Sequence, residues 1–195
     1  MNQKNYLSSS YRNGRDHDGI TEFVSKCAGY EGVICRRLQN SFNSIGKNYI
    51  ICKDYSYLSH PYDVCITNDN NGWFCRIEIE RLQANNVWKS DKNFPNGFHC
   101  VSHLNRKVTK ESDFDIFLKV DHNITPGNFW AYTNKFLMQG IQSNQIVLKK
   151  NAAKFNYVKT DEDRWAIPFK MFENNDEAII KDRNGFIKMI LKFLE

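Results

Sequence analysis

The chain has 195 residues, of which 41% are hydrophobic and 14% aromatic, and its formal net charge at pH 7 is +5. This composition predicts a folded domain with a substantial core and excludes an intrinsically disordered chain. No apolar stretch approaches the roughly 20 residues that a membrane-spanning helix needs, so no membrane partner is expected. The modest positive charge permits a polyanionic partner without requiring one.

Cysteine usage predicts a reducing compartment. The six cysteines form no Cys-x-x-Cys pair and stand beside no histidine at zinc-finger spacing. Most of them lie inside apolar runs, which is typical of buried, reduced thiols. The first twenty residues are polar and contain no secretory signal. We therefore expect a soluble, cytoplasmic protein without structural zinc.

The N-terminal part predicts a polar arm followed by a long helix. Residues 1–17 are polar and are expected to form the arm, and residues 18–195 are expected to form a single domain. The helix is expected to begin near Asp18 or Thr21, because apolar residues then recur at helical spacing. These residues are Ile20, Phe23, Val24, Cys27, Ile34, Leu38 and Phe42.

Glu31 falls on this apolar stripe, four residues after Cys27 and three before Ile34. An acid on an apolar face is costly unless it has a partner, so Glu31 is a candidate site residue. The alternative is that the helix breaks at this point, because Gly29 and Gly32 flank the acid. The sequence leaves both interpretations open.

The next segments predict a β-hairpin. A strand over residues 48–52 is followed by a second strand at Val64–Ile66. The polar run 68–72 ends in glycine and predicts a tight turn, and Trp73–Arg81 predicts the returning strand.

Three acids are expected at the open end of this hairpin. Side chains alternate along a strand, so Glu78 and Glu80 share one face, and Asp63 at the start of the preceding strand approaches them. Clustered carboxylates repel each other unless they are protonated or neutralised, and a divalent cation is the usual neutraliser. An edge strand with its acids in water has the same alternation, and this alternative remains open.

The remaining segments predict an α/β (α+β) chain whose elements run in the order helix, mixed sheet, helix. Residues 91–97 are expected to form a loop. Strands are expected over 98–104, 113–120, 129–132, 145–148 and 164–169, and helices over 134–141 and 186–194. Asp113 and Asp115 share a face of the strand at 113–120, and we interpret them as its wet face rather than as a metal site.

The acids of the hairpin resemble the core motif of the PD-(D/E)XK nuclease superfamily, which has a restriction-endonuclease-like fold. That motif is an acid at the start of one strand and an acid-x-lysine on the next. Pro61-Tyr62-Asp63 stands for the first part, with one residue inserted, and Glu78-Ile79-Glu80 stands for the second. Glu80 replaces the expected lysine, and Lys107, after the next predicted strand, is the candidate for a lysine that has moved. The resemblance covers roughly residues 20–135.

This resemblance implies a mixed central sheet flanked by helices and a metal-dependent endonuclease, with DNA favoured over RNA as the substrate. Asp63 and Glu78 would hold Mg²⁺ or Mn²⁺, and Glu80 would be a further ligand or the base that accepts a proton from water. The first helix of such folds often supplies an acid, which makes Glu31 a fourth candidate metal ligand. Lys107 would stabilise the reacting phosphorus centre.

Nucleic-acid binding would fall to basic residues near this site, namely Arg106, Lys89 and Lys110. Cleavage of both strands of a duplex would suit a two-fold homodimer. The main alternative is a catalytically inactive nucleic-acid-binding or protein-binding accessory protein on the same fold, which Glu80 in place of lysine keeps open.

Overall fold

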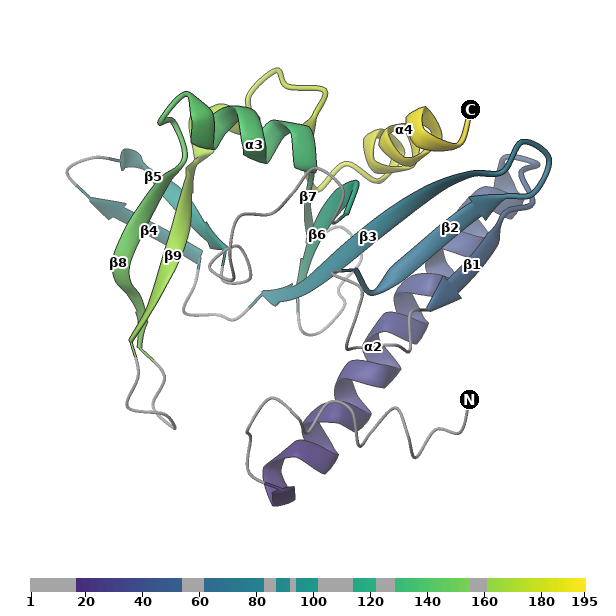
Figure 1. Ribbon diagram of the computed structural model, residues 1–195, viewed down its shortest axis with the longest axis horizontal. Helices are drawn as coiled ribbons and strands as arrows, with labels where there is room; N and C mark the ends of the chain where they lie inside the picture. The colour runs from purple at the N-terminus through teal and green to yellow at the C-terminus, as the bar shows by residue number, and fades with distance from the viewer. Residues whose placement is uncertain are drawn as a thin grey trace. The chain divides into compact units, whose positions relative to one another are not determined.

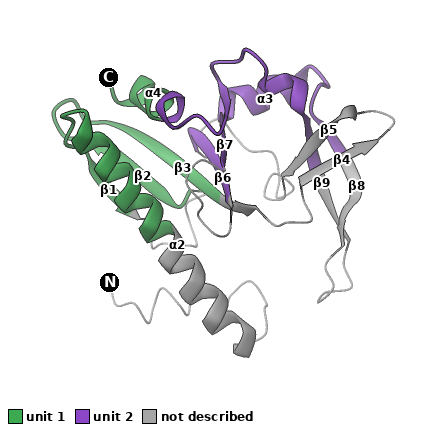
Figure 2. Cartoon of the chain, turned by 180° about the vertical axis from the view of Figure 1, so that it is seen from behind, with its two compact units in different colours: residues 1–79, 187–195 green, residues 80–186 purple. Residues whose placement is uncertain are grey.

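The computed structural model describes residues 17–53, 62–82, 87–91, 94–101, 114–121, 129–154 and 161–195. Side chains are described for residues 31–52, 62–79, 114–120, 129–148 and 165–195. The chain divides into two compact units, which are coloured separately in Figure 2: residues 1–79 with 187–195, and residues 80–186. Within the described residues, no helix has the length and apolarity that crossing a membrane requires.

Unit 1 begins with α2 (His17–Ser44), a helix of 28 residues. Three antiparallel strands follow, β1 (Ile50–Lys53), β2 (Val64–Asn68) and β3 (Trp73–Leu82), of which β3 belongs to unit 1 through residue 79. The helix lies against one face of β1 and β2, behind them in Figure 1 and in front of them in the reverse view of Figure 2.

One face of this sheet forms the core of unit 1. The side chains that are buried on it alternate along the two strands of the hairpin, as the period of a strand requires. They pack with the apolar stripe of α2 and with the end of α4 (Arg183–Leu194), whose residues from 187 onward belong to unit 1. The buried residues are Val64, Ile66, Cys75 and Ile77 from the strands, Ile34, Leu38 and Phe42 from α2, and Ile190 and Leu194 from α4.

The turn between β2 and β3 is held by its own polar groups. Gly72 adopts a φ of +74°, which L side chains rarely adopt, and its N–H donates to the carbonyl of Asn68 over 2.8 Å. The side-chain oxygen of Asn68 accepts from the N–H of Asn70, and that of Asn71 accepts from the N–H of Trp73. This geometry sets the register of the hairpin.

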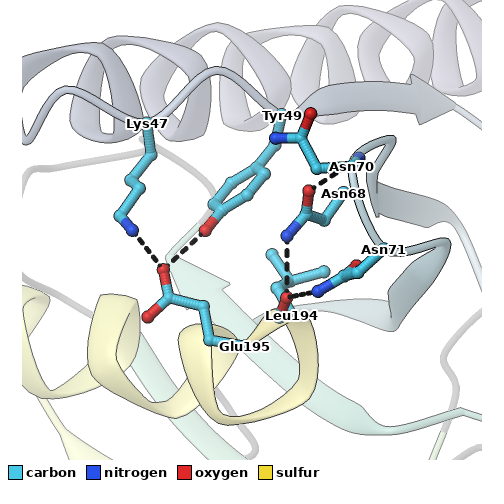
Figure 3. A network of polar contacts seen from close by, with 7 residues as sticks. All are labelled: Lys47, Tyr49, Asn68, Asn70, Asn71, Leu194 and Glu195. Atoms are coloured by element: carbon cyan, nitrogen blue, oxygen red, sulfur yellow. Dashed lines mark hydrogen bonds and ion pairs between the residues drawn. The ribbon is translucent and has the colours of Figure 1, made fainter.

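A polar network joins the turn to the end of α4, as Figure 3 shows. The side-chain amides of Asn68 and Asn71 both donate to the carbonyl of Leu194 over 2.9 Å. Glu195 accepts from the Tyr49 hydroxyl at 2.9 Å and forms an ion pair with Lys47 at 2.6 Å. These two donors lower the pKa of the Glu195 carboxyl. Burial, and then the hydrogen bond to Glu195, raise the pKa of Tyr49 to about 12.

Unit 2 contains two groups of antiparallel strands. One is a four-stranded sheet in the order β4-β5-β9-β8, with β4 at Val87–Asp91, β5 at Phe94–Val101, β8 at Val147–Lys154 and β9 at Asp161–Pro168. In the other, β7 (Phe129–Thr133) lies between β6 (Ile116–Asp121) and β10 (Ala178–Ile180). The helix α3 (Asn134–Gln142) and the 3₁₀ helix η4 (Phe169–Phe172) complete the unit.

Aromatic rings fill the interior of unit 2. Phe117 and Tyr132 stack with their centroids 5.1 Å apart, and Phe136 and Phe172 pack around Tyr132. The hydroxyl of Thr133 caps α3 by accepting from the N–H of Phe136 and itself donates to Glu177 over 2.6 Å.

The expected α+β class is confirmed, and so are the long first helix, the hairpin and the terminal helix. Two expectations are wrong. The segment expected as a loop at residues 91–97 is a strand from Phe94 onward, paired with β4. The strand at 116–120 was expected to expose the face that carries Asp115 to solvent. Phe117 and Lys119, which alternate with Asp115 on that face, are instead fully buried. Residues 1–16 of the expected arm and Asp113 lie outside the described residues.

Candidate functional site

Asp63 stands at the entry to β2 and binds the neighbouring strand on both sides of Glu78. Its backbone N–H donates to the carbonyl of Ile77 over 2.9 Å. Its carboxylate Oδ2 accepts from the backbone N–H of Ile79 over 2.7 Å. The side chain of Asp63 thereby takes the place of a strand carbonyl, and this fixes the acid beside Glu78.

The hairpin explains why these two residues are cross-strand neighbours. The register set by the turn at Gly72 pairs Val64 with Ile77, so the residue before Val64 reaches the strand segment that contains Glu78. Ile77 is fully buried, whereas Glu78 and Asp63 are half-buried. The pair therefore lies at the edge of the unit 1 core, where water reaches the carboxylates only in part.

For the third predicted acid, the structure describes the backbone only. Glu80 is within β3, but its side chain lies outside the described part of the chain. Among the described side chains, no group of three or more His, Cys, Asp and Glu residues is placed to hold a metal ion. The ligand set of Asp63, Glu78 and Glu80 therefore stays a prediction, because the side chain of Glu80 is not described.

Glu31 is buried on the apolar stripe of α2, with 7% of its surface exposed. The helix continues through Gly29 and Gly32 without a break, so the interpretation that it ends beside Glu31 is wrong. Its burial does not test the predicted role of Glu31 as a metal ligand, which stays a prediction.

The side chains of the basic residues predicted for the site are not among those that the structure describes. Lys107, Arg106 and Lys110 lie outside the described residues, and Lys89 lies in β4 with its side chain outside them.

Two residues that the sequence analysis did not select lie on the same strand as Glu78. The guanidinium carbon of Arg76 is 5.5 Å from the centroid of the Phe74 ring, which is within the range of a cation–π contact. Phe74, Arg76 and Glu78 alternate along β3 and so point to one face. That period of two residues was visible in the sequence, but the exposure of Phe74 was not.

In unit 2, Lys119 is another residue to which the sequence analysis gave no role. Its side chain is fully buried, and its strand position pairs with Trp130. A lysine is rarely buried without a polar or aromatic contact, and the alternating pattern of its strand gave no sign of this burial.

The chain matches no family model and no curated protein. Among solved structures it is similar to the bacterial homing endonuclease I-Ssp6803I, with 16% identical residues and a TM-score of 0.33. The likeness covers 57% of this chain and 72% of that chain. Because a likeness of this extent assigns neither a family nor an activity, the function has to be argued from the residues of the chain itself.

Proposed function

We propose that the chain is a metal-dependent endonuclease that hydrolyses phosphodiester bonds, with DNA as the favoured substrate. The observation that carries this proposal is the attachment of Asp63 to the backbone on both sides of Glu78. Two acidic residues thereby become cross-strand neighbours at the open end of the β2–β3 hairpin, which is the arrangement that the resemblance to the PD-(D/E)XK motif implies.

The donor set fits a hard divalent cation. Carboxylate oxygens are the ligands that Mg²⁺ and Mn²⁺ prefer. A carboxylate offers about four lone-pair positions, so accepting the hydrogen bond from Ile79 does not by itself prevent Asp63 from binding a metal ion. The same hydrogen bond fixes the orientation of the carboxylate, which is the usual role of a partner behind a metal ligand.

Each residue has a proposed role in the reaction. Asp63 and Glu78 would hold Mg²⁺ or Mn²⁺, which supplies Lewis acidity and lowers the pKa of bound water. Glu80 would complete the ligand set or accept the proton of the attacking water.

Further residues would act around this centre. Glu31 is proposed as an additional acid from α2. Lys107 would stabilise charge on the phosphorus centre. Arg106, Lys89 and Lys110 would bind flanking phosphates.

The test is a cleavage assay on a panel of DNA and RNA substrates with Mg²⁺, with Mn²⁺ and with a chelator. Glu78→Gln removes the charge and keeps the shape of the side chain. Metal ions contribute several kcal/mol to such reactions, so the loss of one ligand is expected to slow cleavage by at least about 100-fold.

The matched control is Glu173→Gln, which removes an exposed acid from unit 2 and should leave the rate unchanged. A wild-type protein that binds nucleic acid but cuts no member of the panel would favour the inactive binding protein, the alternative that Glu80 in place of lysine suggests.

A further inference from the structure

The sheet face of unit 1 opposite the core is open and carries aligned side chains in two rows. The strand register places Ile50, Thr67 and Phe74 in one row. The next row contains Cys52, Cys65 and Arg76. Phe74 is 51% exposed and Ile50 is 47% exposed. An aromatic ring and an aliphatic side chain are therefore exposed to solvent on the same face of the sheet.

Along β3, this face leads directly to the acid pair. Phe74, Arg76 and Glu78 occupy alternate positions of one strand, and alternate residues of a strand are about 7 Å apart. That spacing is comparable to the length of one nucleotide of an extended strand. A base placed on Phe74 and a phosphate placed at Arg76 would thus direct the next phosphate toward Asp63 and Glu78.

We propose that Phe74 and Arg76 form a platform for single-stranded nucleic acid, on which Phe74 stacks an unpaired base and Arg76 binds the adjoining phosphate. The position of the reacting phosphate beside Asp63 and Glu78 is taken from the proposed nuclease function. The substrate class that follows is a strand that is unpaired at the position of cleavage.

The chemistry of this face suits a nucleic-acid strand. Every base has a π-face that stacks on an exposed aromatic ring, independently of sequence. Arginine binds phosphate through a planar set of donors and also stacks on rings, and the contact with Phe74 already holds its guanidinium over this surface. An anionic membrane surface has no base to stack on the exposed ring of Phe74, so a single strand is the better partner.

The experiment measures binding of a fluorescent single-stranded oligonucleotide by anisotropy, in a chelator so that no cleavage occurs. Phe74→Leu is expected to weaken binding by about 5-fold to 100-fold, the range for the loss of one base stack. Phe74→Tyr should restore the wild-type affinity. Arg76→Gln should weaken binding. It should also make the plot of log affinity against log salt concentration less steep, by about the amount that one phosphate contact contributes. Phe74→Leu should leave that slope unchanged.

The matched control is the neighbouring residue Trp73, which is 52% exposed but points to the other face of β3. Trp73→Leu should bind the oligonucleotide as the wild type does. Circular dichroism and thermal melting of each variant establish that it is folded.

The inference would be overturned by equal losses for Trp73→Leu and Phe74→Leu, by wild-type affinity in Phe74→Leu, or by a wild type that binds no oligonucleotide. Preference for a fully paired duplex or for anionic vesicles would do the same. The proposed nuclease function fails separately. A protein that binds through Phe74 but never cuts in Mg²⁺ retains the platform, and one that cuts normally with Phe74→Leu retains the nuclease activity without it.

Discussion

Asp63 is expected to have two separable roles, one in the stability of the hairpin and one in the proposed reaction. Asp63→Asn keeps an oxygen that accepts the hydrogen bond from Ile79 but removes the negative charge. Asp63→Ala removes both the oxygen and the charge. Comparing the two variants therefore separates the structural contact from the carboxylate chemistry.

The size of the structural effect follows from the contact itself. The bond from Ile79 N–H to Asp63 Oδ2 is 2.7 Å long and half-buried. A hydrogen bond to a charged group contributes about 1.5–3 kcal/mol, and one between neutral groups about 1 kcal/mol. Asp63→Ala should therefore lower the free energy of unfolding by about 1.5–3 kcal/mol, and Asp63→Asn by about 1 kcal/mol. Both variants should lose cleavage by at least about 100-fold.

Urea unfolding and the cleavage assay on the same preparations test both halves of this argument. The control is Asp69→Asn in the exposed turn of the hairpin, which should change neither quantity. Full cleavage activity in Asp63→Asn would refute the role of the carboxylate in the reaction. An Asp63→Ala variant as stable as the wild type would show that the contact with Ile79 does not support the hairpin.

Three further predictions concern unit 1. Gly72→Ala should lower the free energy of unfolding, measured by urea unfolding, by about 1–2 kcal/mol, because L side chains rarely adopt its φ of +74°. No atom lies within 4 Å of the added methyl group, so the backbone conformation alone accounts for this cost. Asn68→Ala should cost about 1 kcal/mol, because its buried amide no longer donates to Leu194; an unchanged urea midpoint would contradict this. Folding raises the pKa of Tyr49 from 10 in the unfolded chain to about 12. The free energy of unfolding should therefore fall by about 2–3 kcal/mol between pH 10 and 12, and Tyr49→Phe should lack this decline.

The hairpin was predictable because its signals are local. The apolar run 64–66 and the alternating residues 76–80 predict the two strands, and Asn71-Gly72 predicts a turn that needs a positive φ. Asp63 could be placed at the start of β2 for the same reason. Its bond to Ile79 could not be predicted, because a shift of one residue in register would have directed the carboxylate elsewhere.

The errors arise where burial depends on distant parts of the chain. The segment around Phe117 and Lys119 alternates as a half-exposed strand does, yet both residues are fully buried. Aromatic residues from positions far along the chain, including Tyr132 and Phe172, fill this interior. Sequence periodicity describes one strand at a time, so it does not show what covers the strand's second face.

Exposure bears on the two interpretations of the acids that the sequence left open. An edge strand with its acids in water would leave both carboxylates exposed and hydrated, as is usual for surface acids. Asp63 and Glu78 are instead half-buried, and Asp63 accepts a short hydrogen bond from the strand backbone. Half-burial and this hydrogen bond fit either a metal site or two acids with separate structural contacts, and the cleavage rates of Asp63→Asn and Glu78→Gln decide between these two interpretations.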